Sequence, residues 1–488
     1  MLRLRCRMVG LALLVLAGAA LSDPSKDKAK PSGPVSYYRD IRPIFQQHCQ
    51  GCHQPARAQG GYIMTTFASM MKAGDSAKPA VVPGHPEKSE LIAQIMPQAD
   101  TKKALMPKNR DALPAAEQTL IRRWVTEGAR DDTPRSVQPA IDEKNPPQYR
   151  LLPVITSIDY SPDGNLLAVA GYHEVLLHKS DGSGLVGRLI GLSERVQSLA
   201  FSPDGKFLAV AGGSPGRFGE IQVWDVAKKK LKYSVTVAFD TLYGVSWSPD
   251  GKVLAFGCPD NTVRALDAET GKQVLFQGAH GDWVLGTTFS QDGEHLVSVS
   301  RDMSMKLTVV KTQRFVDNVT SITPGGLKGG LLAVDRRPQA KSRMVKGVDG
   351  QERLYDEVIT GGSDGQPHLF KIHREVQRVI GDNANKVRDY AQMPGRIFAI
   401  RFSKDGSFFV AGSSLDRQGE VRVYVTDNGK LQSKLDKIGS IYTVAVHPSG
   451  KTIASAGLDG TIRLSDPATG KVIKEFAPVT LQVNTAKK

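Results

Sequence analysis

The sharpest chemical pattern in the sequence is two cysteines and a histidine in one short run, Cys49-Gln50-Gly51-Cys52-His53. A C-x-x-C-H run is the pattern through which c-type haem is attached. Two thiols three positions apart can each add to a haem vinyl group, and the imidazole of His53 can reach the iron from the same side. The run therefore predicts one covalent haem c, bound by Cys49 and Cys52, with His53 as an axial ligand.

Two other chemistries use closely spaced cysteines. A structural zinc site needs four ligands, and the only other cysteine after the first 22 residues is Cys258. A thioredoxin-like redox pair belongs in a βαβ frame, and no such pattern surrounds Cys49. The sequence therefore favours haem over a zinc site and over a redox disulfide.

The second axial ligand of such an iron would come from later in the chain. Methionine sulfur and histidine nitrogen are the common choices. The residues that offer them are Met64, Met70, Met71, His85, Met96 and Met106. Ligation by His53 and a methionine would fill both axial positions and oppose direct binding of a substrate at the iron.

Two helices are expected to position these residues. Apolar residues recur at helical spacing before the motif and again near the end of the segment, which predicts two amphipathic helices. The first set is Tyr37, Tyr38, Ile41, Ile44 and Phe45, and the second is Leu120, Ile121, Trp124 and Val125. Residues 36–132 are therefore expected to form a small all-α haem domain.

The first 22 residues have the three parts of a secretory signal peptide. Three arginines (Arg3, Arg5 and Arg7) precede an apolar run of 12 residues from Val9 to Ala20, and small residues follow it. Spanning a bilayer takes about 20 apolar residues, so cleavage is favoured over a retained membrane anchor. No later stretch approaches that length. The protein is expected to be exported to the periplasm or another extracytoplasmic space.

The second half of the chain repeats. The tetrapeptide Ser-Pro-Asp-Gly occurs at 161–164, 202–205 and 248–251, and variants of it occur at 290–293, 403–406 and 447–450. Their spacing is 41, 46, 42, 113 and 44 residues, and the long interval has room for one additional, expanded unit. A period of about 40–45 residues is typical of a propeller with four strands per blade. Seven all-β blades are therefore expected over residues 151–480.

The remaining segments read as linkers. Residues 23–35 are polar and without periodicity, which predicts disorder. Residues 133–150 are rich in proline, and residues 481–488 form a short tail. The expected organisation is therefore multidomain: a signal peptide, a linker, an all-α haem domain, a second linker, a propeller and a tail.

Several propeller residues could do chemistry but are expected to be structural. Cys258 lies in an apolar strand, which predicts an inert, buried thiol. His280, Asp282 and Trp283 fit a hydrogen-bonding network between strands. The expanded fifth blade lacks the Asp-Gly turn and carries a polar, basic stretch, Arg336 to Arg353.

The repeats resemble the WD-repeat family over about residues 154–476, with Trp224-Asp225 as the one Trp-Asp pair. The segment around Cys49 resembles the cytochrome c domain of large secreted planctomycete proteins. The matching pieces are Asp40–Phe45, Cys49–His53, Val82–Ser89, Leu105–Pro107, Trp124 and Gly128-Ala129. This resemblance implies Met106 as the second axial ligand, although Lys108 stands where the family commonly has a second proline.

The charge of the chain is strongly positive, at +15, while its 23% of charged and 40% of hydrophobic residues are ordinary for a globular protein. No nucleic-acid-binding module is recognisable. Four basic residues flank Met106 and would steer an acidic redox partner toward the haem. They are Lys102, Lys103, Lys108 and Arg110.

These observations predict an exported electron carrier whose propeller docks protein partners. The sequence has no Gly-x-Ser-x-Gly, no His-Glu-x-x-His and no phosphate-binding glycine loop, so a carrier is favoured over an enzyme. Two alternatives stay open. One is a periplasmic oxidoreductase with an additional cofactor or substrate site on the propeller, and the other is a scaffold with a structural or sensory haem.

Overall fold

A computed structural model describes most of the chain. The described residues are 33–49, 53–54, 57–64, 66–98, 103–108, 112–134, 141, 146–321, 328–338, 343–379 and 381–482. The predicted signal peptide, most of the linker at 23–35 and most of the tail lie outside them. The chain divides into two compact units, a helical unit (residues 1–44 and 81–132) and a β unit (residues 45–80 and 133–488). Residues 36–132, predicted as one domain, are thus shared between the two.

The helical unit is built from short helices. They are the π-helix η1 (Tyr37–Ile41), the 3-10 turn η3 (Pro86–Lys88), α3 (Glu90–Ile95) and α4 (Ala115–Thr126), and α1 (Arg42–His48) crosses its boundary. The start of η1 is capped twice. The Arg39 amide donates to the Ser36 hydroxyl, and the Ser36 amide donates to the Asp40 carboxylate, both at 3.0 Å. Such bonds satisfy amides that have no partner inside the helix.

The core of this unit lies against α4, which confirms the helix predicted there. Ile121, Trp124 and Val125 are buried on one face of α4. The rings of Tyr37 and Trp124 lie 5.6 Å apart, so α4 packs against η1. The Glu127 carboxylate just beyond α4 accepts the Val35 amide at 2.7 Å and fixes the entering chain. Among the described helices, none has the length and apolar character needed to cross a membrane.

The segment 45–80 is not purely helical, which corrects the all-α prediction for 36–132. It contains two-residue strands as well as helical turns: β1 (His53–Gln54), β2 (Arg57–Ala58), the 3-10 turn η2 (Gln59–Gly61) and α2 (Phe67–Met70). The two strands pair antiparallel, with His53 opposite Ala58. The chain reverses direction directly after the motif, so its backbone groups pair across the reversal. Strands of two residues are too short to be predicted from the periodicity of apolar residues in the sequence.

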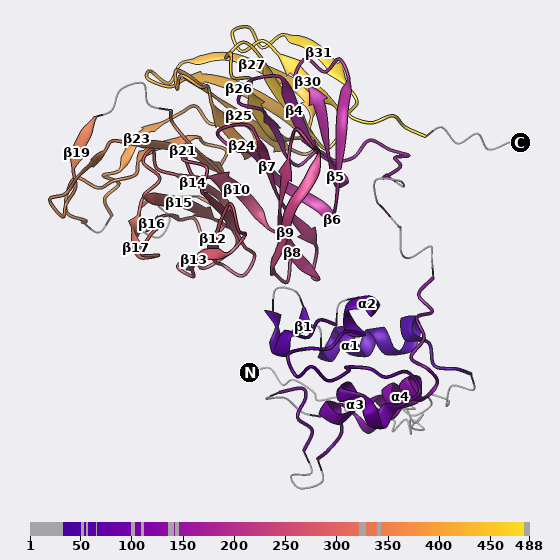
Figure 1. Cartoon of the computed structure of the whole chain (residues 1–488). Helices are drawn as coiled ribbons and strands as arrows, with labels where there is room; N and C mark the ends of the chain where they lie inside the picture. Colours follow the sequence, from indigo (N-terminus) through magenta and orange to yellow (C-terminus); the bar gives the residue numbers. More distant parts are fainter. Residues whose placement is uncertain are drawn as a thin grey trace, which may run out of the picture. The chain divides into compact units, whose positions relative to one another are not determined.

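The rest of the β unit is a series of antiparallel sheets (Figure 1). The first has seven strands in chain order, β3 (Ile158–Tyr160), β4 (Leu166–Ala170), β5 (Tyr172–Lys179), β6 (Leu185–Phe201), β7 (Phe207–Ser214), β8 (Phe218–Asp225) and β9 (Lys230–Ala238). The 17-residue β6 pairs with β5 through its first half and with β7 through its second half. This sheet therefore corresponds to two four-stranded units that share β6.

Five sheets of four strands follow. The first consists of β10 (Tyr243–Trp247), β11 (Val253–Gly257), β12 (Val263–Asp267) and β13 (Gln273–Gln277). The second consists of β14 (Val284–Phe289), β15 (His295–Ser300), β16 (Met305–Val309) and β17 (Phe315–Asn318). The next joins β18 (Leu331–Arg336), β21 (Glu357–Gly362), β22 (His368–Lys371) and β23 (Lys386–Asp389). The last two are β24 (Arg396–Phe402), β25 (Phe408–Leu415), β26 (Gln418–Val425) and β27 (Leu431–Gly439), then β28 (Ile441–Val446), β29 (Ile453–Gly457), β30 (Ile462–Ser465) and β31 (Val472–Phe476).

The expanded unit of the sequence is the sheet that begins with β18. A separate hairpin, β19 (Met344–Lys346) with β20 (Glu352–Leu354), is inserted between β18 and β21. The basic stretch of the sequence therefore includes a small β ladder of its own. The insertion explains why the repeat spacing is so long at this point.

The repeated tetrapeptides form the turns that join the first and second strands of the units. Their last glycines all have a positive φ between 67° and 75°: Gly164, Gly205, Gly251, Gly293, Gly406 and Gly450. In five of these turns the serine hydroxyl donates to the aspartate two residues later at 2.5–2.7 Å. The glycine that ends each tetrapeptide therefore supplies the positive φ that these tight turns require.

Apolar residues of neighbouring sheets pack together along the whole series. The β7–β8 strands share one buried cluster with β10–β12, for example, and β25–β26 share one with β28–β29. Ile155 and Ile158, at the beginning of the first sheet, lie in one cluster with Ala454 and Ile462 of the last. The Ile155 amide also donates to the Gly457 carbonyl at 2.9 Å. The first and last sheets are therefore in contact.

The turn at Gly251 provides a clean stability test. Its φ is 72°, and a Cβ there would meet nothing closer than 3.8 Å, so substitution by alanine introduces backbone strain without a steric clash. We expect Gly251→Ala to lower the free energy of unfolding by about 1 kcal/mol in urea titrations. Gly278→Ala is the control, because a Cβ at Gly278 meets open space. An equal loss in both variants would contradict this account.

Candidate functional site

The Cys49–His53 motif begins where α1 ends. The Cys49 amide donates to the Phe45 carbonyl at 2.9 Å, which extends the helical bonding by one residue. The His53 amide then donates to the Cys49 carbonyl at 3.0 Å, so the same four-residue spacing bridges the motif. Cys49 is buried, and Cys52 lies outside the described residues. Two consecutive helical-type bonds thus set the backbone on either side of residues 50–52.

The ring of His53 is fixed by a backbone carbonyl. Its Nδ1 lies 3.2 Å from the carbonyl oxygen of Tyr62. A carbonyl can only accept, so Nδ1 must carry the proton and donate it. The other ring nitrogen, Nε2, then keeps its lone pair, which is the arrangement of a histidine that binds a metal ion. The Tyr62 ring packs edge-on against the imidazole, with ring centroids 5.6 Å apart.

These features fit a haem. The imidazole of His53 has the correct tautomer for axial ligation. Cys49, four residues earlier in the chain, is buried. The loop that supplies the Tyr62 carbonyl is itself tied to the motif, because the Met64 amide donates to the His53 carbonyl at 2.8 Å.

The six residues predicted as possible second ligands are spread over both units. Met64 and Met70 are fully buried in the same unit as the motif. Met106 belongs to the helical unit, is half-buried, and has its amide bound to the Gln94 carbonyl at 2.9 Å. Ligation by Met106 therefore stays a prediction.

The other three candidates have simpler surroundings. Met71 and Met96 are half-buried, and Met96 follows α3 directly rather than lying inside a helix. The exposed His85 ring has its Nδ1 3.0 Å from a Glu87 carboxylate oxygen. None of these contacts selects one of them as a ligand.

Of the four basic residues predicted to steer a redox partner, two can be located. Lys103 and Lys108 are both exposed. Lys102 and Arg110 lie outside the described residues. The exposed pair is consistent with a docking role without demonstrating it.

His280 takes part in a hydrogen-bonding network, as predicted, but its side-chain partners include Asp302 and Ser298 rather than Asp282 and Trp283. Its Nδ1 lies 2.9 Å from Asp302 and its Nε2 lies 2.8 Å from the Ser298 hydroxyl. His368 is held in the same way between Asp364 and Asp389, at 2.9 and 2.6 Å. Both histidines are buried and bonded through both nitrogens, which supports a structural role.

The Cys258 thiol is fully buried, as the sequence predicts, and burial raises its pKa to about 12. Only the thiolate reacts quickly with alkylating reagents. We therefore expect Cys258 to stay unmodified by iodoacetamide from neutral to mildly alkaline pH while the protein is folded, and to react once urea unfolds it. The measurement is the difference in labelling between the wild type and Cys258→Val. Labelling of the folded protein at the rate of an exposed thiol would contradict this expectation.

Comparison with protein families places this geometry in context. Residues 49–109 match the family model described as planctomycete cytochrome C. Residues 184–225, 271–308 and 429–466 match the WD domain, G-beta repeat, and residues 217–280 match the anaphase-promoting complex subunit 4 WD40 domain. The chain joins a segment similar to planctomycete cytochrome c to WD repeats.

The curated relatives match the WD-repeat region. A ribosome biogenesis protein WDR12 homolog from Chlamydomonas reinhardtii is 28% identical over 146 residues, which are 27% of this chain and 33% of the relative. A guanine nucleotide-binding protein subunit beta-like protein from Encephalitozoon cuniculi is 23% identical over 240 residues, which are 48% of this chain and 67% of the relative. A serine-threonine kinase receptor-associated protein from Gallus gallus is 21% identical over 249 residues, 47% and 68% of the two chains. The chain thus spans a third of the first of these relatives and about two thirds of the other two.

Sequence reasoning missed two groups of residues. Tyr62 orients His53 through its carbonyl, and no side-chain pattern reports a backbone acceptor. Glu174 is fully buried in the WD-repeat region and accepts bonds from the Tyr149 hydroxyl at 2.8 Å and the Arg188 guanidinium at 2.6 Å. Tyr149 was predicted to lie in a linker, yet it is buried and pairs with Leu481 across a parallel bridge.

Proposed function

We propose that this protein is an exported haem c electron carrier whose WD-repeat region docks protein partners. The observation that carries the electron-transfer part is the bond between His53 Nδ1 and the Tyr62 carbonyl. It prepares Nε2 of the histidine in a C-x-x-C-H motif for a metal. The match of residues 49–109 to planctomycete cytochrome c supports the same assignment.

The chain's own residues would hold one haem, and the bound haem would supply a one-electron couple at its iron. Cys49 and Cys52 provide the two thioether links, and His53 provides one axial nitrogen. Met106 is the proposed second ligand, on the strength of the resemblance of its Leu105–Pro107 segment to the family. A thioether opposite an imidazole raises the reduction potential relative to two imidazoles.

We propose further that the sheets of the WD-repeat region close into a seven-bladed propeller. The two units that share β6 and the five four-stranded sheets supply the seven blades. Support for closure comes from the apolar cluster shared by the first and last sheets and from the bond between the Ile158 amide and the Thr443 hydroxyl at 3.0 Å. Closure of this kind buries the apolar faces of the first and last sheets against each other and leaves only short sheet edges exposed.

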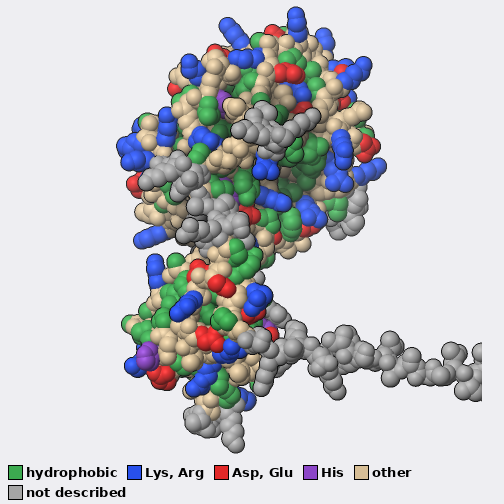
Figure 2. Space-filling model, turned by 90° about the vertical axis from the view of Figure 1, so that its right-hand side faces the viewer, with side chains coloured by type: hydrophobic (Ala, Val, Ile, Leu, Met, Phe, Trp, Pro, Cys, Tyr) green, Lys and Arg blue, Asp and Glu red, His purple; other side chains and the backbone are tan. Residues whose placement is uncertain are grey.

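The WD-repeat region offers side chains of the types found at protein interfaces. Tyr243 and Trp283 stack with ring centroids 5.9 Å apart, and the Arg301 guanidinium lies 5.0 Å from the Trp283 centroid. Two apolar residues in loops between strands are also exposed. Phe239 directly follows β9 and is 50% exposed, and Met303 lies between β15 and β16 and is 44% exposed. Aromatic residues and arginine dominate binding energy at interfaces. Figure 2 shows many Lys and Arg side chains among hydrophobic ones on one face of the WD-repeat region, and positive charge of this kind favours an acidic partner.

Protein docking is consistent with the relatives' names, one of which calls its protein receptor-associated. Export is proposed from the leader sequence and from the chemistry, because covalent haem attachment takes place outside the cytoplasm. Lys103 and Lys108, both exposed, would attract an acidic electron-transfer partner, and added salt would weaken that attraction.

The test is a pyridine haemochrome assay with a reduced-minus-oxidised spectrum, on full-length protein exported by a host that attaches haem c. We expect one covalent haem per chain and a methionine-to-iron charge-transfer band that Met106→Ala removes. Met96→Ala is the matched control, because Met96 also precedes a proline, and the band should survive there. Absence of covalent haem would overturn the electron-transfer proposal.

A further inference from the structure

One repeat turn in the WD-repeat region differs from its counterparts in two side chains. After the Asp-Gly pair, four turns continue with a neutral or basic residue and then an apolar one: Asn165-Leu166, Lys206-Phe207, Lys252-Val253 and Ser407-Phe408. The turn before β15 continues with Glu294-His295 instead. A basic or neutral position has become acidic, and an apolar strand position has become an imidazole.

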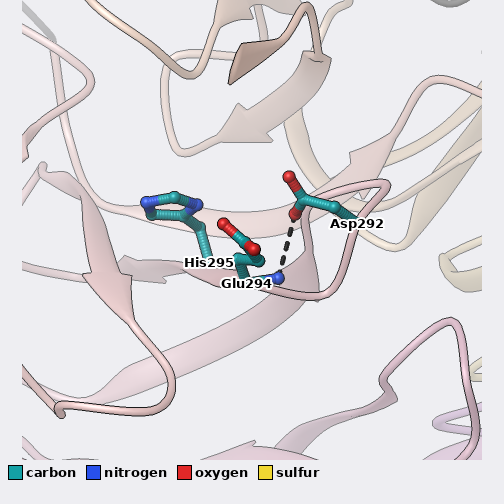
Figure 3. Close-up of side chains that lie close together, drawn as sticks. All are labelled: Asp292, Glu294 and His295. Carbon is teal, nitrogen blue, oxygen red and sulfur yellow. Dashed lines mark hydrogen bonds between the residues drawn. The ribbon is translucent and has the colours of Figure 1, made fainter. Parts of the chain in front are cut away.

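These two residues come together with the aspartate of the turn (Figure 3). One ring nitrogen of His295 and one oxygen of each carboxylate, from Asp292 and Glu294, lie within 4.8 Å of one another. Oδ1 of Asp292 accepts the Ser290 hydroxyl at 2.5 Å and the Glu294 amide at 2.9 Å. Those two bonds fix the Asp292 carboxylate in place.

The second observation concerns the burial of His295. His295 is only 6% exposed, and its Nδ1 is buried without a hydrogen-bond partner. A buried polar nitrogen without a partner costs free energy comparable to a lost hydrogen bond. The corresponding residues Leu166, Phe207, Val253 and Phe408 pose no such problem, since they have no polar side-chain atom. An unpartnered nitrogen beside two carboxylates points to a missing ligand with a positive charge.

The expanded fifth unit contacts this turn, in which Asp292 and Glu294 are exposed and His295 is buried. The Gln291 amide donates to the buried Asp356 carboxylate, just before β21, at 2.6 Å. The His373 ring, which follows β22, lies edge-on to the His295 ring with centroids 4.8 Å apart, and His373 is 7% exposed. Two arginines also act electrostatically on His295: Arg353 on β20, whose guanidinium is bound to Asp349 at 2.7 Å, and the exposed Arg314. A second imidazole therefore flanks the cluster, and the arginine of β20 has its own acidic partner.

We propose that Asp292, Glu294 and His295 bind one divalent transition-metal ion of the Zn²⁺ class. Two carboxylates balance its charge, and the imidazole selects it over Ca²⁺ and Mg²⁺, which prefer oxygen ligands alone. Three protein ligands leave a coordination position for water or for His373. Ligation by His373 would tie the fourth repeat to the expanded fifth one. This site is independent of the haem assignment.

The experiment is calorimetric titration of the full-length protein with ZnCl₂, comparing wild type with two variants. His295→Val and Glu294→Lys each install the residue of the preceding repeat, Val253 or Lys252, so both are expected to fold. We expect the wild type to bind one more Zn²⁺ than His295→Val does. Glu294→Lys and Asp292→Asn are expected to bind that ion at least about tenfold more weakly than the wild type. Asp250→Asn, in the preceding turn, is the matched control for Asp292→Asn and should keep full binding.

X-ray absorption at the zinc edge separates this site from the cysteines of the haem motif. The proposal requires a first shell of nitrogen and oxygen at about 2.0–2.2 Å, whereas thiolate ligation would show sulfur at about 2.3 Å. Zn²⁺ should also raise the unfolding temperature of the wild type but not of His295→Val. The proposal is overturned if the wild type binds no Zn²⁺, if both variants bind it unchanged, or if the shell contains sulfur.

Discussion

His53→Ala is expected to abolish the low-spin haem spectrum and the reversible reduction of the protein at its wild-type potential. The reason is that this substitution removes the motif histidine, whose proton position is already set for a metal by the 3.2 Å contact of Nδ1 with the Tyr62 carbonyl. Cys49 and Cys52 are untouched, so the covalent haem content in the pyridine haemochrome assay should remain near one per chain. The measurement is an absorption spectrum with a redox titration.

Two comparisons make this result specific. Imidazole added to the His53→Ala protein should restore a low-spin spectrum, because a free ligand can occupy the vacated position. His85→Ala is the control, since His85 is an exposed histidine whose ring contacts Glu87, and its spectrum should equal that of the wild type. A wild-type spectrum in His53→Ala would reject His53 as the ligand. Loss of the low-spin spectrum in His85→Ala would instead make His85 the second ligand in place of Met106.

Glu174→Ala is expected to lower the free energy of unfolding of the WD-repeat region by about 3 kcal/mol, because removing one member of a buried ion pair leaves the other charge uncompensated. Glu174 is fully buried, and its carboxylate accepts two bonds from Arg188, both at 2.6 Å, and one from Tyr149. The Arg188 side chain is 26% exposed, which keeps the expected loss at the lower end of the range for buried pairs. Urea unfolding followed by tryptophan fluorescence measures it.

Glu194→Ala provides the matched control for that substitution. Glu194 also pairs with an arginine, Arg217, but at 3.3 Å and with side chains that are 36% and 51% exposed. Exposed pairs contribute less than about 1 kcal/mol. Equal destabilisation by the two glutamate substitutions would show that the Tyr149–Glu174–Arg188 cluster does not anchor the start of the WD-repeat region.

Much of the local structure follows from short-range patterns. The positive φ at the turn glycines, the serine-to-aspartate bonds and the helix at 115–126 each depend on residues within about five positions of one another. The long repeat interval likewise predicts an expanded unit, which the structure contains between β18 and β21. Such features could be predicted because the groups that interact are neighbours in the chain.

Other features depend on contacts between distant residues. Tyr149 reads as linker sequence, and only its contacts with Glu174 and Leu481 make it part of the β unit. The strands after the motif are too short for their periodicity to show. A backbone carbonyl nine residues away sets the tautomer of His53, and no residue type announces that bond.

Three features can be identified from residue types and spacing alone: the C-x-x-C-H motif, the repeat of Asp-Gly turns and the net charge of +15. These depend on residue identity and spacing, which are properties of the chain alone. The tertiary structure decided which side chains are held ready to act. Burial of His295 beneath the expanded fifth unit and protonation of His53 at Nδ1 both arise because desolvation and hydrogen bonding depend on what lies nearby in space rather than on what precedes or follows in the chain.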